Sequence, residues 1–412
     1  MKKLIFIFLI TGISVLINAQ SVGFYFNRGE ERLEKHDYLN AIKDFNEVIS
    51  KNKKYHEAYY NNGLAYMGLK KYDDAVSFFT KAIKVKPDYL DAFLKRAECN
   101  MILGKKQESM KDISAVIKLK PDYTGAYDKR GDLYFSSGKK EKAFADYTKA
   151  VKLGTKRHQT YFRLAEMYAQ KGEKDKAIEF YDKALKFGGD KAKIYALLAN
   201  LYYDKADYKT AVDYLNKAIS LENYDEKTYQ KLADSYLKLG NCDNAIKTYQ
   251  RQIQLYHTRD KMLYLNKGKC FMKKKNYSQA LKDFNKSIAF DRSFTEAYLM
   301  RAEANSKLGK ENLVIRDFNK ALQLSPKNYS VYQKRAEYYL RKKDYNKALA
   351  DIQKAFSLNK NPDKDMYFYR AICLLNKGDL QNACKDLKIA SGKGHNDAKE
   401  IYGNKCYTPG RR

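Results

Sequence analysis

The sequence predicts an all-α protein, an α-solenoid of about eleven helix pairs that ends in one further helix. Two observations predict this fold. Aromatic and small residues recur with a period of 34 residues through most of the 412-residue chain, and a period of this length indicates a repeat architecture. The chain also contains only 5 Pro and 21 Gly, which argues against long linkers or disorder between the repeated segments.

The segment before the repeats, residues 1–19, is predicted to be a signal peptide. Lys2 and Lys3 form a short basic region, residues 4–17 are almost wholly apolar, and Ala19 is a small residue at a plausible cleavage point. The alternative is a transmembrane anchor, although the apolar run is short for a span of about 20 residues. No cysteine precedes Cys99, so we do not expect a lipoprotein. We therefore predict an exported protein, in the periplasm, at the cell surface or secreted, and the segment's ending resembles exported proteins of Bacteroidetes-type bacteria.

The repeat unit is clearest in the 34 residues that begin at His56, HEAYYNNGLAYMGLKKYDDAVSFFTKAIKVKPDY. Its marked positions are aromatic at 4, 11 and 24, small at 8, 20 and 27, and proline at 32: Tyr59, Tyr66, Phe79, Gly63, Ala75, Ala82 and Pro87. Position 4 is aromatic in all eleven copies: Tyr25, Tyr59, Phe93, Tyr127, Tyr161, Tyr195, Tyr229, Tyr264, Tyr298, Tyr332 and Tyr367. The copies begin near residues 22, 56, 90, 124, 158, 192, 226, 261, 295, 329 and 364, with single-residue insertions before 261 and 364.

This pattern resembles the tetratricopeptide repeat (TPR), and the resemblance covers residues 22–397. It implies a right-handed superhelix of helix–turn–helix units. It indicates little about function, because function depends on the residues placed on a fold and not on the fold itself.

Physical reasoning agrees with the resemblance. A single helix pair cannot bury the apolar faces of both helices, so neighbouring pairs must stack into a continuous core. Small residues such as Gly63 and Ala75 are expected to let the two helices approach closely. The aromatic residues at position 4 are expected to fill core space that the family often gives to Trp; a row of tyrosines that stacks on a ligand is the alternative.

The last segment, residues 398–412, is predicted to cap the array. Ala398–Cys406 looks like one more helix, with Ile401 and Tyr402 placed to cover the last repeat. The end of a solenoid needs such a cap to hide apolar surface from water. Residues 408–412 are expected to form a frayed tail.

Position 7, usually apolar in the family, is basic in seven repeats, and each of these repeats has an aspartate at position 23 of its second helix. The pairs are Arg28 and Asp44, Arg96 and Asp112, Arg130 and Asp146, Lys267 and Asp283, Arg301 and Asp317, Arg335 and Asp351, and Arg370 and Asp386. The other four repeats have neither residue. We therefore predict a structural ion pair within each of the seven repeats, for which the planar fork of Arg suits a carboxylate.

Six cysteines occur, and export would permit disulfides. Cys384 lies on the last second helix and Cys406 on the expected cap, so we predict a disulfide between them. Cys242 and Cys270 lie at helix ends that antiparallel packing would bring together, and they are the second candidate pair. Buried free thiols are the alternative. The sequence has no CxxC motif and no close Cys–His cluster, so we expect no zinc.

No catalytic chemistry is indicated. The five histidines are scattered, and no HExxH, GxSxG or phosphate-cradling glycine motif is present. We therefore expect neither an enzyme nor a bound cofactor.

The resemblance implies that positions 2, 5, 9, 12 and 13 of the first helices line a concave groove. Repeats 2 to 5 place an apolar strip there: Tyr60, Met67, Leu94, Met101, Phe135 and Phe162. Repeats 7 to 10 place cations at position 13: Lys238, Lys273, Lys307 and Arg341. This arrangement suits a partner with acidic and apolar character, whereas the alternatives are packing between neighbours for the strip and a favourable helix dipole for the cations.

The predicted function is a non-catalytic scaffold that mediates protein–protein interactions in the bacterial cell envelope. The formal net charge is +31, and lysine recurs at position 26 of the second helices. These lysines are expected to form a solvated face. The alternative function is binding of polyanions or envelope polymers through this charge, because a large net charge steers association. Nucleic acid is not expected as a partner, because export would remove the chain from it.

Overall fold

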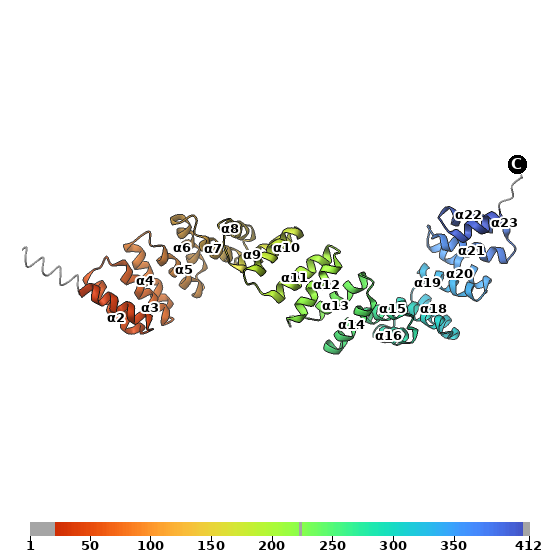
Figure 1. Ribbon diagram of the computed structural model, residues 1–412, viewed down its shortest axis with the longest axis horizontal. Helices are drawn as coiled ribbons and strands as arrows, with labels where there is room; N and C mark the ends of the chain where they lie inside the picture. The colour runs from red at the N-terminus through yellow and green to blue at the C-terminus, as the bar shows by residue number, and fades with distance from the viewer. Residues whose placement is uncertain (1–20, 222–224, 407–412) are drawn as a thin grey trace, which may run out of the picture. The chain divides into compact units, whose positions relative to one another are not determined.

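The computed structural model describes residues 21–221 and 225–406, in which every regular element is a helix (Figure 1). This confirms the predicted all-α class. The chain forms two compact units, Met1–Leu201 and Tyr202–Arg412. The predicted signal peptide, residues 1–19, and the predicted tail, residues 408–412, lie outside the described residues.

Residues 21–34 are helical, and they are followed by a regular series of helices of 10 to 15 residues. Their bounds are α2 (Tyr38–Lys51), α3 (His56–Gly68), α4 (Tyr72–Val85), α5 (Leu90–Ile102), α6 (Lys106–Leu119), α7 (Thr124–Ser136), α8 (Lys140–Lys152), α9 (His158–Gln170), α10 (Lys174–Lys186), α11 (Lys191–Asp204), α12 (Tyr208–Ser220), α13 (Glu226–Lys238), α14 (Cys242–Tyr256), α15 (Lys261–Lys273), α16 (Tyr277–Phe290), α17 (Thr295–Lys307), α18 (Glu311–Leu324), α19 (Tyr329–Arg341), α20 (Tyr345–Leu358), α21 (Lys364–Asn376), α22 (Leu380–Gly392) and α23 (Asn396–Lys405).

The odd-numbered helices from α3 to α21 are the first helices of repeats 2 to 11, and each begins within one residue of its predicted position. A first helix packs against the second helix of its own repeat, and that second helix packs against the next first helix, as in α3, α4 and α5. Each unit is therefore a stack of helix pairs that share a continuous core.

Glycine at position 8 allows the two helices of a repeat to approach closely. A Cβ atom added to Gly63 would lie 2.5 Å from the ring of Phe79, and one added to Gly131 would lie 2.6 Å from the ring of Tyr147. Phe79 and Tyr147, both at position 24, are fully buried. The aromatic ring of the second helix thus lies directly on the backbone of the first, which accounts for the small residue at position 8.

The position-4 aromatic residues contribute to the architecture, as expected. In several repeats the tyrosine hydroxyl donates to a backbone carbonyl six residues earlier, in the turn between repeats. Examples are Tyr161 to Thr155 at 2.8 Å and Tyr127 to Pro121 at 3.0 Å. The ring is therefore fixed at both ends, by core packing and by this hydrogen bond.

All seven predicted pairs are formed. Arg130 donates from Nε to Asp146 Oδ2 at 2.7 Å and from Nη2 to Oδ1 at 2.8 Å, and the other five arginines grip their aspartates in the same two-pronged way. The seven aspartates are only 2–6% exposed. Each pair therefore joins the two helices of its repeat through a buried carboxylate.

The cation of each pair also lies over the position-4 ring of its own helix. The centroid distance is 5.7 Å for Arg130 over Tyr127, and it ranges from 5.2 to 5.9 Å across the seven repeats. Positions 4 and 7 are one helical turn apart, so this contact follows from the helix itself. The ring covers the guanidinium and adds a cation–π attraction.

Three of the arginines reach into the preceding repeat as well, which the sequence had not indicated. Arg96 Nη1 donates to Thr80 Oγ1 at 3.0 Å, Arg301 Nη1 to Asn285 Oδ1 at 2.7 Å, and Arg335 Nη1 to Asn319 Oδ1 at 2.6 Å. The acceptor stands at position 25 each time. A single guanidinium thus connects three helices in two successive repeats.

The pair in repeat 8 is less complete because it uses lysine. Lys267 Nζ lies 2.9 Å from Asp283 Oδ1, whereas Asp283 Oδ2 is buried without a hydrogen-bond partner. Burial raises the pKa of Asp283 above its ordinary value of 3.8. Lysine is a point charge and cannot satisfy both carboxylate oxygens as the arginine fork does.

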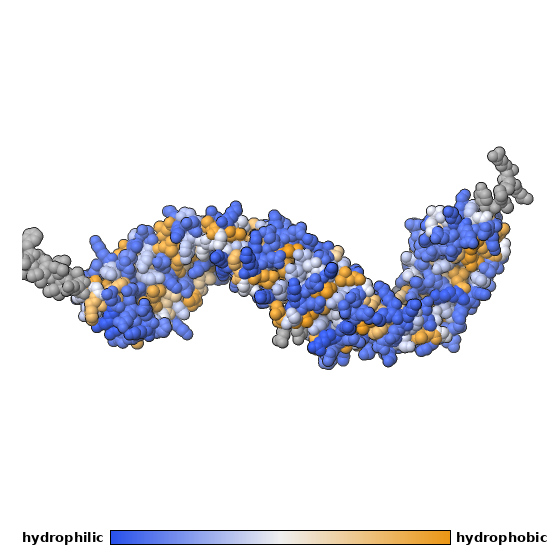
Figure 2. All heavy atoms as spheres, viewed as in Figure 1, coloured by the Kyte–Doolittle hydropathy of each residue, from blue (hydrophilic) through white to orange (hydrophobic). Residues whose placement is uncertain are grey.

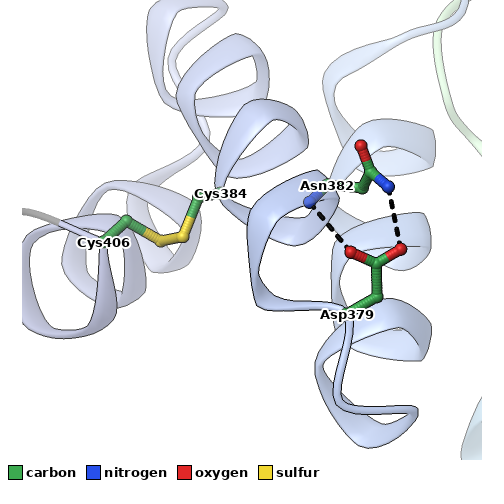
Figure 3. The surroundings of a disulfide bond; sticks show 4 residues. All are labelled: Asp379, Asn382, Cys384 and Cys406. Carbon is green, nitrogen blue, oxygen red and sulfur yellow. Dashed lines mark hydrogen bonds between the residues drawn. A yellow bond between two sulfur atoms is a disulfide. The ribbon is translucent and has the colours of Figure 1, made fainter.

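A disulfide joins the last repeat to the cap (Figure 3). Cys384 of α22 is bonded to Cys406, with their Cα atoms 5.6 Å apart, as predicted. The cap helix α23 begins two residues earlier than expected, because the His395 side chain accepts a hydrogen bond from the amide of Ala398. Asp379 caps α22 by accepting from the amide and side chain of Asn382. Ile401 and Tyr402 cover the apolar end of the last repeat as expected.

The second predicted disulfide, between Cys242 and Cys270, is absent. Packing brings the two residues together in one apolar cluster, but both thiols are free. Burial raises the pKa of Cys270 to about 12. The thiolate that disulfide exchange requires is therefore scarce, and these cysteines pack as small apolar residues.

Replacing Asp146 by Ala should lower the free energy of unfolding by roughly 3 kcal/mol, because the largely buried Arg130 would lose its carboxylate. Adding Arg130→Leu should recover part of this loss, because the other repeats show that leucine fits position 7. Urea denaturation of both variants measures the coupling. Equal stability of the single and double variants would contradict a buried pair.

Replacing Lys267 by Arg should raise the free energy of unfolding by about 1 kcal/mol at pH 7, because Asp283 Oδ2 would gain a donor. The gain should shrink as the pH falls toward 3.8. In the wild type the folded-state pKa of Asp283 is raised, so the protonated carboxyl group stabilises the fold at low pH and this stabilisation is lost as the pH rises. The variant removes part of that loss. Urea denaturation of the wild type and of the Lys267→Arg variant at pH 7 and pH 4 tests this dependence. Lys282→Arg, on the exposed side of α16, is the control and should be neutral. An equal gain from the control would contradict the role assigned to the unpaired Asp283 oxygen.

Candidate partner-binding face

The first helices lie on the inner side of the local curvature in each unit. First helices of consecutive repeats contact one another, as in α3 with α5, α15 with α17 and α19 with α21. Within the described ranges, consecutive second helices do not approach as closely. The face made by positions 2, 5, 9, 12 and 13 of the first helices, here called the first-helix face, is therefore the concave one.

The described part of this face exposes apolar side chains in repeats 2 and 3, and again at Met262 of repeat 8, which is 39% exposed. Met101 is 40% exposed and its neighbour Ile102 is 53% exposed. Met67 and Leu94 are half-buried and pack against the cores of their own repeats. Hydrophilic residues cover most of the surface seen in Figure 2, and hydrophobic ones form separate patches. Met67, Leu94 and Met101 are the aliphatic part of the predicted apolar strip that a partner could reach, and Ile102, which was not predicted, adds to it.

The three aromatic residues predicted for the strip do not offer bare apolar surface. Phe162 is only 6% exposed, with Lys193 Nζ 4.7 Å from its ring centroid. The Arg163 guanidinium lies 4.3 Å over the ring of Phe135. Tyr60 packs between Phe79 and Tyr89, and burial raises its pKa to about 12. Phe162 is therefore too buried to serve as a contact, whereas Tyr60 and Phe135 are half-buried, and their place in the strip stays a prediction.

A buried polar cluster interrupts the first-helix face at repeats 4 and 5. Asp128, at position 5, is buried and accepts hydrogen bonds from the hydroxyls of Thr155 and Thr160. Burial raises the pKa of Asp128 above its usual range. Asp132 pairs with Arg157 at 2.7 Å and accepts from the Tyr147 hydroxyl. An aspartate at position 5, where the other early repeats have apolar residues, was the signal that sequence reasoning missed.

The four predicted cations at position 13 are exposed and end their helices: Lys238, Lys273, Lys307 and Arg341. Among the residues that the structure describes, no carboxylate oxygen lies within 4 Å of any of them. Arg341 makes one long contact, 3.4 Å to Ser306 Oγ. We call these four residues the cation row.

The charges around the cation row are paired. Lys274 and Lys342, each one residue further along the chain, contact Asp243 and Glu311 of the preceding repeats. On the first-helix face itself, Lys269 lies 2.6 Å from Glu296, and Lys334 lies 3.5–3.7 Å from Glu337 and Glu303. The cation row therefore lacks close ion pairs, although Asp234 and Glu337, one helical turn before Lys238 and Arg341, act on these two cations through space.

The described residues contain neither a candidate membrane-spanning helix nor a candidate metal site. None of their helices has the length and apolar character needed to cross a membrane. No group of three or more His, Cys, Asp or Glu side chains within residues 21–221 and 225–406 is placed to hold a metal ion.

Comparison with known proteins gives short or distant likenesses. The chain is 39% identical to Protein unc-45 homolog B of Danio rerio over 75 residues, which are 17% of this chain and 8% of that protein. It is 41% identical to the Xenopus laevis protein of the same name over 70 residues, 16% of this chain and 7% of that protein. The chain thus matches less than a tenth of the length of these curated relatives.

Solved structures with similar folds include a tetratricopeptide repeat protein from Parabacteroides merdae, at 20% identity and a TM-score of 0.46, covering 61% of this chain and 99% of that one. They also include YrrB, described as a TPR protein with an unusual peptide-binding site, at 22% identity and a TM-score of 0.41, covering 46% and 97%. Yeast Tom70 is 17% identical with a TM-score of 0.38, covering 93% and 94%.

Family models with the description tetratricopeptide repeat match residues 56–89, 129–193, 192–225, 231–293, 295–328 and 334–391. Together these segments cover well over half of the chain. The matches at 56–89, 192–225 and 295–328 each coincide with one predicted repeat. The chain belongs to the tetratricopeptide repeat family.

Proposed function

We propose that this protein is a non-catalytic scaffold that binds a partner protein through its first-helix face. The observation that carries the proposal is the cation row, whose four side chains form no ion pair within 4 Å in the described part of the chain, whereas Lys269, Lys274, Lys334 and Lys342 beside them do. Exposed cations without close ion pairs on a concave face favour an acidic segment of a partner. The exposed Met101 and Ile102 in the other unit favour apolar side chains, since methionine adapts to varied surfaces.

We further propose that the chain is exported and works in the bacterial cell envelope. The Cys384–Cys406 disulfide supports this, because such bonds persist in oxidising compartments. The basic and apolar residues 1–19 support it as well. Mass spectrometry of the chain purified from its source should give a mature protein that begins at Gln20. A chain that retains Met1–Ala19 would overturn removal of the segment.

Replacing both Lys273 and Lys307 by Glu should abolish capture of the partner, because like charges would then face its acidic segment. The mature chain, residues 20–412, is used to capture proteins from envelope extract at low and high salt, read by mass spectrometry. We expect one protein to be retained at both salt concentrations by the wild type and lost by the variant.

The control variant replaces Lys286 and Lys354, exposed lysines at position 26 of the second helices, by Glu. It makes the same change in net charge and should retain the partner. The contrary result is capture of many unrelated anionic molecules, lost at high salt and equally reduced in both variants. It would mean that net charge alone causes binding, and the scaffold proposal would be abandoned.

A further inference from the structure

A large hollow lies on the other side of the repeat stack and is lined mainly by residues of α16, α17 and α18. Its volume is about 1050 Å³, comparable to sites that hold small organic molecules. Its floor is apolar and consists of Ile288, Ile315 and the ring of Tyr298. We call it the second-helix cleft. It is separate from the first-helix face, so nothing below rests on the proposed function.

The lining of the cleft has an excess of positive charge. Arg292 and Arg316 are exposed at the cleft, and neither side chain makes an ion pair or a hydrogen bond within the described residues. Asp317 is the one carboxylate among the lining residues, and its oxygens already accept hydrogen bonds. It accepts from Arg301 at 2.6 and 3.0 Å and from Asn305 Nδ2 at 3.2 Å. No anionic oxygen of the lining is left to balance the two free arginines.

The amide side chains of the cleft are oriented by neighbouring cations. Asn285 Oδ1 accepts from Arg301, Asn319 Oδ1 accepts from Arg335, and Gln323 Oε1 accepts from Lys320 at 2.9 Å. Guanidinium and ammonium groups can only donate, so each amide must direct its oxygen toward the cation. The three NH₂ groups are consequently left as donors.

The cleft is therefore rich in hydrogen-bond donors and holds two arginines without an anionic partner. A neutral sugar would leave both guanidinium charges unbalanced. Phosphate and sulfate oxygens only accept at neutral pH, and arginine forks fit them well. The volume exceeds that of a single such ion, and the apolar floor can cover a carbon skeleton. We propose that the second-helix cleft binds a ligand that carries two or more phosphate or sulfate groups.

Such a ligand could be a free small molecule or a segment of an anionic polymer, because both present the same oxyanions. Two probes distinguish the sources: inorganic triphosphate and a sulfated hexasaccharide. Each is titrated calorimetrically into the mature chain at fixed ionic strength, with inorganic sulfate as the single-anion comparison. Tighter binding of triphosphate indicates a small ligand, and tighter binding of the hexasaccharide indicates a polymer segment.

The test variant replaces Arg292 and Arg316 by Gln. Both side chains are exposed and unpaired, so the fold should be unaffected, as circular dichroism would verify. We expect the affinity for the better probe to fall roughly tenfold or more, because two charge-assisted contacts are lost. The matched control replaces Lys247 and Lys354, exposed lysines of second helices outside the cleft, by Gln and should change affinity by less than about threefold.

Two results would overturn the proposal. One is the absence of saturable binding for both multivalent probes, or binding no tighter than that of inorganic sulfate. The other is an equal loss of affinity in the test and control variants, which would show that the probes respond to net charge and not to the cleft.

Discussion

The buried carboxylate at position 23 is the constraint on which much of this architecture depends. Once Asp146 is placed between two helices, it requires a cation that can reach it, and position 7 is the facing site. The cation in turn is covered by the ring at position 4 of the same helix. Where an acceptor stands at position 25, the third arm of the arginine extends this arrangement to the preceding repeat. A polar group thus sets the relative placement of three helices, which apolar packing alone would hold less specifically.

The same arrangement explains why the outer side of the stack can carry a site. Arg301 and Arg335 occupy the amide oxygens of Asn285 and Asn319, so a structural contact determines which atoms face the solvent. On the inner side the lysines and glutamates largely neutralise one another, and the cation row stands out because it forms no close ion pair within the described residues. Both candidate binding surfaces are therefore defined by the charges that remain after the structural pairs are formed.

The fold and the seven pairs could be predicted because they depend on one repeat at a time. The 34-residue period gave the helix starts, and the joint occurrence of a basic residue at position 7 with aspartate at position 23 gave the pairs. Features that involve two repeats were missed, such as the covering of Phe162 by Lys193, because side-chain reach across a repeat boundary leaves no regular mark. The acceptors at position 25 vary between Thr and Asn, so they formed no visible pattern. Cys242 and Cys270 were correctly brought together, but their burial was underestimated.

The arginine that reaches two repeats gives the stack an uneven response to mechanical load. Contacts between positions 7 and 25 of successive repeats occur early in the chain, at Arg96 and at Asn62 with Asn46, and again at Arg301 and Arg335. Repeats 4 and 8 form no such contact among the described residues, and repeats 5 to 7 carry Leu164, Leu198 and Leu232 at position 7. Under tension the repeats of this middle segment should separate at lower force than the flanking repeats. A single-molecule stretching trace should then contain a separate step at low force.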